Sequence, residues 1–225
     1  MVLQATLPPL VRGEWIEMTS EEFDRWLPSD VQGEWVRGKG IAFVSNSDRH
    51  QWTVSLAYEL ISRFSKLYDM GRVITTHYEM RLEDQESRRQ PDVLYVAPEH
   101  FDRWESKRLI GPADYAMEIV SDDSVKRDYQ EKFAEFALAG VREYVIIDNR
   151  EGHRFRFDYF RLGADGRYHR VDADEDGRYH SEVLPGFWLD ARWFAANPLP
   201  DSLVLLKRIA PEGWRRLIAE IDAEI

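Results

Sequence analysis

Two short apolar runs and the helix that follows them decide the fold of this chain: QPDVLYV at residues 90–96, YAMEIV at 115–120 and DYQEKFAEFALAG at 128–140. The first two have the length and the β-branched and aromatic content of strands. The third spaces its aromatic residues by threes and fours and ends at Gly140, as an amphipathic helix does. A further strand, EYVIID, follows at 143–148. A strand–helix–strand connection makes a right-handed parallel crossover, whereas the earlier strands are close enough in sequence to pair antiparallel. We therefore predict an α/β (α+β) domain with a central mixed β-sheet flanked by helices.

The segments that precede this stretch add helices and strands to the same domain. A capping-box pattern opens a short helix within residues 18–27, and residues 33–45 hold two apolar runs around glycines, which indicates a β-hairpin. Residues 48–70 carry large apolar side chains every three or four positions and predict a long helix. The run VITTHYEMRL at 73–82 predicts one strand.

The segments after residue 148 predict an appended hairpin and a helical tail. Residues 153–171 alternate aromatic and polar side chains on both sides of a GADG turn. The tail at 201–225 has a helical pattern that Pro211 interrupts. These features divide the chain into an N-terminal extension at 1–17, a main domain at 18–196 and a C-terminal helical extension at 197–225.

Composition restricts the class of protein. The chain has 225 residues, of which 44% are hydrophobic, and it has no cysteine, so disulfides, zinc–thiolate sites and thiol nucleophiles are excluded. We find no secretory signal and no apolar run of the length that a membrane span needs, and we expect a cytoplasmic protein. The formal net charge of −11 counts against a broad nucleic-acid-binding surface, so any basic footprint must be local.

Eight tryptophans raise the question of base stacking. Trp26 and Trp52 fall on apolar faces of predicted helices, so we expect both to fill the core.

Two carboxylates are the candidates for chemistry. Glu118 interrupts the apolar run YAMEIV, and an acid inside a core strand is costly unless it is paired or bound to a metal. Asp92 follows Pro91 and opens the neighbouring strand. Hard cations such as Mg²⁺ take oxygen ligands and often use only one or two protein carboxylates. The alternatives are that Glu118 faces solvent or pairs with a basic side chain, and that Asp92 bonds to its local backbone.

One lysine and two histidines lie near these acids in the predicted fold. Lys132 stands fourteen positions after Glu118 on the following helix, near its inward face, so its ammonium would reach the same site. The alternative for Lys132 is a surface pair with Asp128, four residues earlier. His50 and His77 fit packing roles, and we leave both outside the predicted site.

Basic side chains also stand at the start of this helix. Lys126 and Arg127 would contact phosphate there, while the hydroxyl and carboxyl groups at 121–123 would cap the helix.

The segments QPDVLYV at 90–96 and ADYAMEIVSDDSVKRDYQEKFAEFALAGVREYVIID at 113–148 resemble the Uma family of restriction endonuclease-like proteins. That family is a domain of unknown function placed in the PD-(D/E)XK nuclease superfamily. The similarity runs from MTSEEF near residue 18 to VLPGFWLD near residue 190. It implies a restriction-endonuclease-like core.

The resemblance also implies roles for individual residues. Asp92 would supply the first acid of the motif, Glu118 the second, and Glu34 the acid of the early hairpin, and together they would hold Mg²⁺ or Mn²⁺. The position two after Glu118 is Val120 and not lysine. The resemblance suggests Lys132 as the substitute.

The function implied is a metal-dependent endonuclease that hydrolyses phosphodiester bonds in nucleic acid, DNA above all. Lys132 would orient or help deprotonate the attacking water and stabilise the charge on the phosphate. Cutting both strands of a duplex suits a two-fold homodimer. The alternative is a non-catalytic module that binds protein or nucleic acid, which the net charge and the missing lysine favour.

Overall fold

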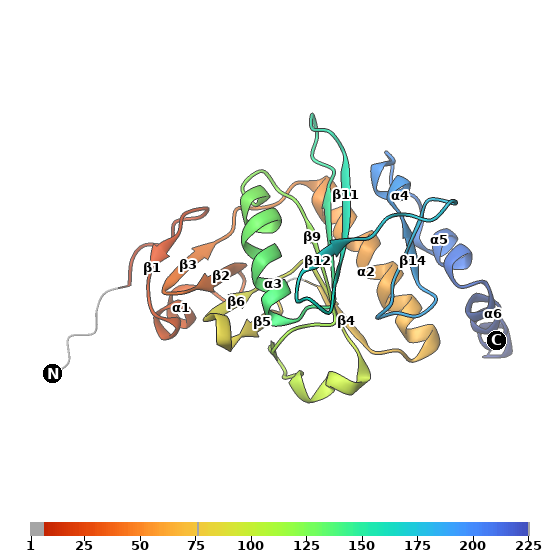
Figure 1. Cartoon of the computed structure of the whole chain (residues 1–225), viewed down its shortest axis with the longest axis horizontal. Helices are drawn as coiled ribbons and strands as arrows, with labels where there is room; N and C mark the ends of the chain where they lie inside the picture. The colour runs from red at the N-terminus through yellow and green to blue at the C-terminus, as the bar shows by residue number, and fades with distance from the viewer. Residues whose placement is uncertain (1–6, 76, 225) are drawn as a thin grey trace.

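The computed structural model describes residues 7–75 and 77–224 of the chain, and it is built around two six-stranded sheets (Figure 1). The central sheet has the strand order β12–β11–β10–β9–β7–β4. Its strands are β4 (Arg72–Thr75), β7 (Val93–Val96), β9 (Tyr115–Ile119), β10 (Glu143–Asp148), β11 (Arg156–Leu162) and β12 (Tyr168–Arg170). β9 and β10 are parallel and the other neighbours are antiparallel, which confirms the predicted mixed sheet and crossover.

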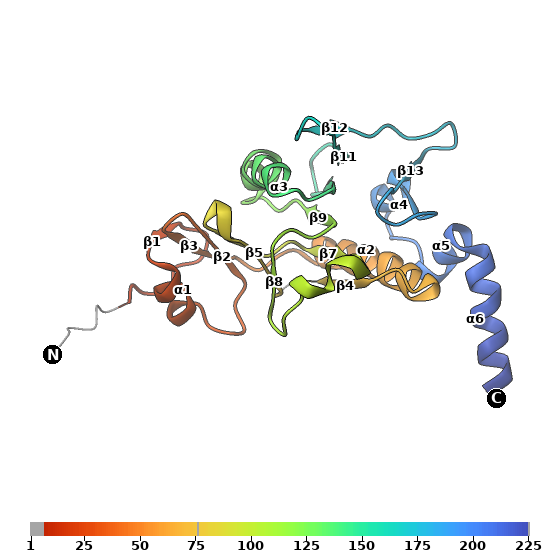
Figure 2. The same ribbon diagram turned by 60° about the horizontal axis from the view of Figure 1, so that its bottom comes forward.

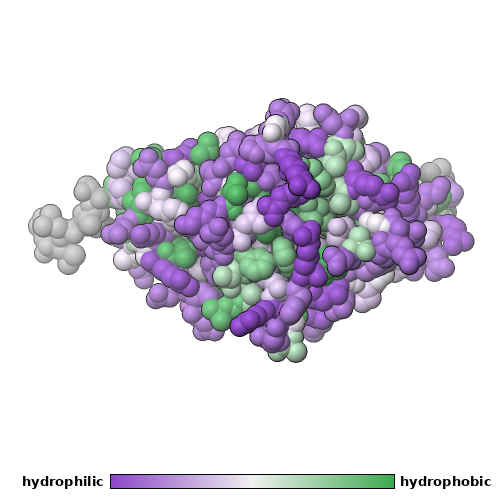
Figure 3. Space-filling view, turned by 45° about the horizontal axis from the view of Figure 1, so that its top comes forward, coloured by the Kyte–Doolittle hydropathy of each residue, from purple (hydrophilic) through white to green (hydrophobic). Residues whose placement is uncertain are grey.

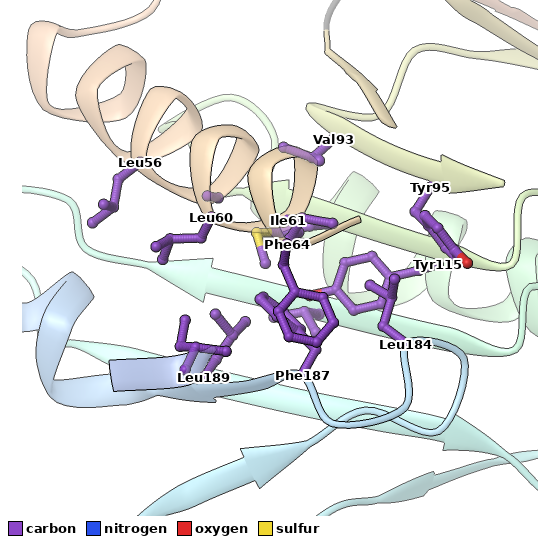
Figure 4. Packing of buried hydrophobic residues seen from close by; sticks show 14 of the residues in the cluster. Leu56, Leu60, Ile61, Phe64, Val93, Tyr95, Tyr115, Leu184, Phe187 and Leu189 are labelled. Carbon is purple, nitrogen blue, oxygen red and sulfur yellow. The ribbon is translucent and has the colours of Figure 1, made fainter. Parts of the chain in front are cut away.

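Helices cover both faces of the central sheet (Figure 2). On one face lies α2 (Asp48–Tyr68), which places Leu60 and Phe64 in the larger of the hydrophobic clusters, opposite Tyr115 and Phe187 (Figure 4). On the other face a π-helical turn, η3 (Arg127–Lys132), continues directly into α3 (Phe133–Ala139). Gly140 ends α3 in the left-handed conformation, as predicted.

Side chains of the central strands alternate between these two faces, as the two-residue period of a strand requires. Val93 of β7 and Met117 of β9 lie in the cluster under α2, while Leu94 and Ala116 lie in the cluster under α3. Glu118 is two positions after Ala116, so its side chain is on the same face as those of Leu94 and Ala116. It therefore takes the place of an apolar residue on the α3 face of the sheet.

The second sheet has the strand order β1–β3–β2–β6–β5–β8. Its strands are β1 (Ile16–Glu17), β2 (Gly33–Val36), β3 (Lys39–Ala42), β5 (Glu79–Leu82), β6 (Ser87–Arg89) and β8 (Arg108–Ile110). Helix α1 (Ser20–Trp26) packs on it and has the predicted capping box between Thr19 and Glu22. β2 and β3 form the predicted hairpin.

The prediction of a single strand over residues 73–82 is wrong. β4 belongs to the central sheet and β5 to the second sheet. His77, between them, has a φ of 67°, a left-handed conformation that a continuous strand cannot contain. The run therefore carries the chain from one sheet to the other.

The C-terminal part packs beside α2. It contains the strand pair β13 (Arg178–His180) and β14 (Trp188–Asp190), then α4 (Ala191–Ala195), α5 (Ser202–Ile209) and α6 (Pro211–Glu224). Pro211 separates the last two helices, as predicted. The described residues also include two short 3₁₀ helices, η1 (Glu83–Gln85) and η2 (Pro98–Arg103).

The prediction that Trp26 and Trp52 both fill the core is correct for Trp26 only. Trp26 is buried beside Phe23, whereas Trp52 is 60% exposed. Trp52 lies about 200° around α2 from the buried His50 and Val54 but only four positions before the buried Leu56, so it stands at the edge of the buried stripe. Its indole is therefore left largely exposed.

The surface is mostly hydrophilic on the face that Figure 3 shows, with small separate hydrophobic areas. Within residues 7–75 and 77–224, no helix combines the length and the apolar character needed to cross a bilayer.

The packing of α2 on the sheet gives a test of the fold. Leu60 is fully buried, so we expect Leu60→Ala to lower the free energy of unfolding by about 2–5 kcal/mol. Leu138→Ala deletes the same atoms from a side chain that is 71% exposed and should change it by less than about 0.5 kcal/mol. Urea denaturation followed by circular dichroism measures both. Similar losses in the two variants would contradict the placement of α2.

Candidate functional site

Four charged residues singled out in the sequence come from four different segments. Glu34 lies in β2, Asp92 immediately before β7, Glu118 in β9, and Lys132 at the end of η3. All four are buried. β7 and β9 are neighbouring antiparallel strands paired through Val93 and Met117, and one further step of that register sets Asp92 opposite Glu118.

Lys132 lies at the centre of this group. Its Nζ donates a hydrogen bond to Glu118 Oε1 at 2.7 Å and lies 3.0 Å from Glu34 Oε1 and 3.6 Å from Asp128 Oδ1. The Lys132 side chain is 3% exposed. Asp128 is indeed its neighbour, but the alternative of an exposed helix pair is wrong because both side chains are buried.

The charges around Lys132 fix its protonation. Burial by itself would lower the pKa of its ammonium, but Glu118, Glu34 and Asp128 outweigh burial and raise that pKa above the ordinary value. Lys132 therefore carries a positive charge across the physiological pH range.

Glu34 connects the second sheet to this cluster. Its Oε2 lies 2.8 Å from Arg89 and 3.8 Å from Arg127, and its Oε1 accepts the N–H of Gln90 at 3.1 Å. Burial would raise the pKa of the Glu34 carboxyl, but the charges of Lys132, Arg89 and Arg127 lower it to about 2. Glu34 is thus an ionised carboxylate with three cationic side chains close to it.

Glu118 has the opposite electrostatic balance. Burial raises its pKa well above the ordinary value, and the neighbouring acids Asp128, Asp92 and Glu34 raise it further, while Lys132 offsets only part of this. The pKa of Asp128 is also raised, first by burial, although Lys132 opposes the shift. Burial is therefore the first cause of both raised pKa values, and the charges of neighbouring acids add to it.

Asp92 is held by the end of β9 and by α2. Its Oδ2 accepts the N–H of Ile119 at 2.8 Å and lies 3.4 Å from His50 Nε2. Burial lowers the pKa of His50, but the hydrogen bond and charge of Asp92 outweigh it and raise that pKa. Sequence analysis left His50 outside the predicted site, because a lone histidine in the first turn of a helix fits many packing roles.

A cavity of about 30 Å³ opens beside these groups, which is room for about two water molecules. Its lining includes His50, Asp92, Glu118, Arg127, Asp128 and Lys132. Asp128 Oδ1 and His50 Nδ1 are buried without a hydrogen-bond partner among the described residues.

A divalent cation fits the chemistry of this lining, since Asp92 and Glu118 offer the carboxylate oxygens that Mg²⁺ and Mn²⁺ prefer, and Asp128 adds a third carboxyl group to the same lining. As the side chains are placed, no group of three or more His, Asp or Glu residues in the described part of the chain is arranged to hold a metal ion.

The two basic residues predicted to contact phosphate differ in position. Arg127 lines the cavity but is buried, lies 3.6 Å from Asp123 and covers the Phe43 ring. Lys126 is exposed, does not line the cavity and lies 3.5 Å from Glu131. Only Arg127 is therefore close enough to act on a group bound in the cavity.

The fold defines the class of protein. A mixed sheet between helices, with acids on two neighbouring strands and a lysine on the crossover helix, is the architecture expected of a restriction-endonuclease-like domain. The model of the Uma2 family, described as "Putative restriction endonuclease", matches residues 20–192, and the chain belongs to this family.

A solved structure has the same fold. The crystal structure of a "putative nuclease belonging to DUF820" from Anabaena variabilis superposes with a TM-score of 0.64 at 16% sequence identity, covering 78% of this chain and 96% of that one. A comparison with curated proteins finds no match. This likeness shows a shared fold.

The two glutamates should respond differently to the same substitution in metal-free protein. The lowered pKa of Glu34 means that its ionised form stabilises the fold above about pH 4.5, and that this contribution disappears as the pH falls toward about 2. Glu34→Gln should therefore destabilise the protein at pH 7 by about 3–5 kcal/mol, with a smaller loss at low pH.

The raised pKa of Glu118 means that ionisation costs stability as the pH rises above its ordinary value, so Glu118→Gln should melt at the wild-type temperature or higher at pH 7. Thermal melts in EDTA at several pH values measure both variants. Equal destabilisation by the two substitutions at pH 7 would refute the opposite pKa shifts of Glu34 and Glu118.

Proposed function

We propose that this protein is a Mg²⁺- or Mn²⁺-dependent endonuclease that hydrolyses phosphodiester bonds in DNA. The observation that supports the proposal most strongly is the gathering of three carboxyl groups, from Asp92, Glu118 and Asp128, in the lining of one cavity beside Lys132, whose raised pKa keeps it charged. Buried acidic groups cost stability unless they are paired or bound to a metal, and they are concentrated at functional sites. A cation bound between Asp92 and Glu118 would favour their ionised forms.

The cation would supply two effects when bound: it lowers the pKa of a coordinated water and offsets charge on the scissile phosphate. Asp92 and Glu118 would be its protein ligands. Ile119 and His50 hold Asp92 in place through its Oδ2 atom. Glu34, although implied as a ligand by the family resemblance, is already bound by Arg89 and Lys132, so we assign it to positioning Lys132.

Lys132 would act as a cation and not as a base. Its raised pKa keeps a proton on Nζ, which suits orienting a water molecule by hydrogen bonding and stabilising the negative charge that develops on the phosphate. Release of that proton would require the carboxylates around it to be neutralised first. Arg127, which also lines the cavity, would add a second positive charge near the phosphate.

Metal binding gives the first test of this proposal. Millimolar Mn²⁺ or Mg²⁺ should raise the melting temperature, because a ligand at 100 times its Kd stabilises the folded state by about 2.7 kcal/mol. Asp92→Asn removes a ligand charge and should abolish the rise. Asp165→Asn changes an acid on the distant β11–β12 turn and should keep it. A wild-type melting curve that ignores both ions would refute cation binding.

Lys132 gives the second test. We expect Lys132→Met to lower the cleavage rate of labelled DNA roughly 10²–10³-fold, the scale for losing one charge-stabilising donor. Because Lys132 is buried among acids, the variant should also lose about 3–5 kcal/mol of stability, so rates must be taken at a temperature where circular dichroism shows it folded.

The control is Lys207→Met, which makes the same change in α5 and should cleave as wild type does. Wild-type cleavage in a folded Lys132→Met protein would exclude a catalytic role for the lysine. Failure of the wild type to cleave DNA or RNA, single-stranded or duplex, would instead favour a non-catalytic nuclease-fold module.

A further inference from the structure

A large groove opens directly beside the candidate site. It encloses about 820 Å³, and four residues line both the groove and the small cavity: Val44, Asn46, Ser121 and Asp123. The two spaces are therefore adjacent. A nucleic-acid strand whose scissile phosphate lay at Asp92 and Glu118 would place an adjoining nucleotide in this groove.

Trp52 lines this groove and is unusually exposed for its type. It is 60% accessible to solvent, compared with 38% for Trp15, and it contributes nothing to the hydrophobic clusters beneath α2. α2 begins at Asp48, and the same first turns carry His50, the partner of Asp92. Helix α2 thus holds His50 beside Asp92, a candidate metal ligand, and also exposes the indole ring of Trp52 to the neighbouring groove.

The charges of the groove indicate which part of a nucleotide it suits. Its lining contains four carboxylates, from Asp48, Asp122, Asp123 and Glu151, against two arginines and His153. Arg49 donates to the main-chain oxygens of Phe194 and Ala196, and Arg150 is bound to Asp148 and Asp122. Neither guanidinium is available as a phosphate clamp, so a phosphate would be repelled here.

A neutral planar group, unlike a phosphate, would not be repelled by these carboxylates. Aromatic side chains bind nucleobases by stacking, and every base has a face suited to it. Asn46 and Asn197 also line the groove and offer amide donors and acceptors of the kind that base edges bond. The groove is therefore complementary to a base, while the adjoining cavity is complementary to a cation and its phosphate.

We infer that Trp52 is a stacking platform for an unpaired nucleobase adjacent to the scissile phosphate, and that the preferred substrate is single-stranded at that position. This inference rests on the proposed nuclease function. A base held in a duplex is stacked on both faces and cannot present one of them to Trp52 without first being extruded.

Binding measurements test the inference without requiring cleavage. The ligands are three fluorescent oligonucleotides of equal length with hydrolysis-resistant phosphorothioate linkages: a thymidine strand, a fully abasic strand and a perfectly paired duplex. Fluorescence anisotropy in Mg²⁺ buffer gives Kd for wild type, Trp52→Ala, Trp52→Phe and the exposed-residue control Leu138→Ala.

We expect Trp52→Ala to bind the thymidine strand roughly 5- to 150-fold more weakly than wild type, the range that loss of one stacked base gives. The abasic strand should bind both proteins equally, because it has no base to lose, and the duplex should change less than about twofold. Trp52→Phe, which keeps an aromatic face, should retain most of the affinity, and Leu138→Ala all of it.

The inference is overturned if Trp52→Ala binds the thymidine strand as wild type does, if the abasic strand loses as much affinity as the thymidine strand, or if wild type binds none of the three ligands. Parallel cleavage assays on ordinary phosphodiester DNA keep the two proposals apart. A protein that cleaves duplex DNA without regard to residue 52 retains the nuclease function and loses the base site. A protein that cleaves nothing but binds single strands through Trp52 retains the base site alone.

Discussion

The ammonium of Lys132, held between the carboxylates of Glu34 and Glu118, is the interaction on which the arrangement of the site depends. It joins three elements that are distant in sequence: a strand of the second sheet, a strand of the central sheet and the π-helical turn before α3. Arg89 extends the connection by bridging Glu34 to Glu135 of α3. Because removing Lys132 or Glu34 would leave buried opposite charges uncompensated, the arrangement depends most on these two residues.

Stability alone does not explain this cluster. Buried ion pairs are rarely more stabilising than well-packed apolar side chains of similar volume. Here burial and three neighbouring acids raise the pKa of Glu118, whereas the charges of Lys132, Arg89 and Arg127 lower the pKa of Glu34. The carboxyl groups of Asp92, Glu118 and Asp128 all line the cavity, which is where a cation and a phosphate would enter.

The same charges distinguish the cavity from the groove beside it. The cavity gathers carboxylates around a fixed cation, and the groove beside it combines an exposed indole with amides and further acids. An overall charge of −11 is compatible with nucleic-acid chemistry under these conditions, because affinity would come from a bound cation and from base stacking and not from a broad basic surface. The π-helical turn that carries Lys132 is a local departure of the kind found at functional sites.

The sequence by itself determined the longer helices, the β2–β3 hairpin and the central mixed sheet, because hydrophobic period, capping and glycine positions are local properties. It also singled out Asp92, Glu118 and Lys132, through an acid in an apolar strand and through resemblance to a nuclease family. Tertiary structure alone decided how residues 73–82 divide between two sheets, that Asp128 is buried with Lys132, and that His50 reaches Asp92. It also turned Trp52 outward, against a helical pattern that suggested burial. Those outcomes depend on which distant segment covers each face, and local periodicity carries no information about the partner that a face will meet.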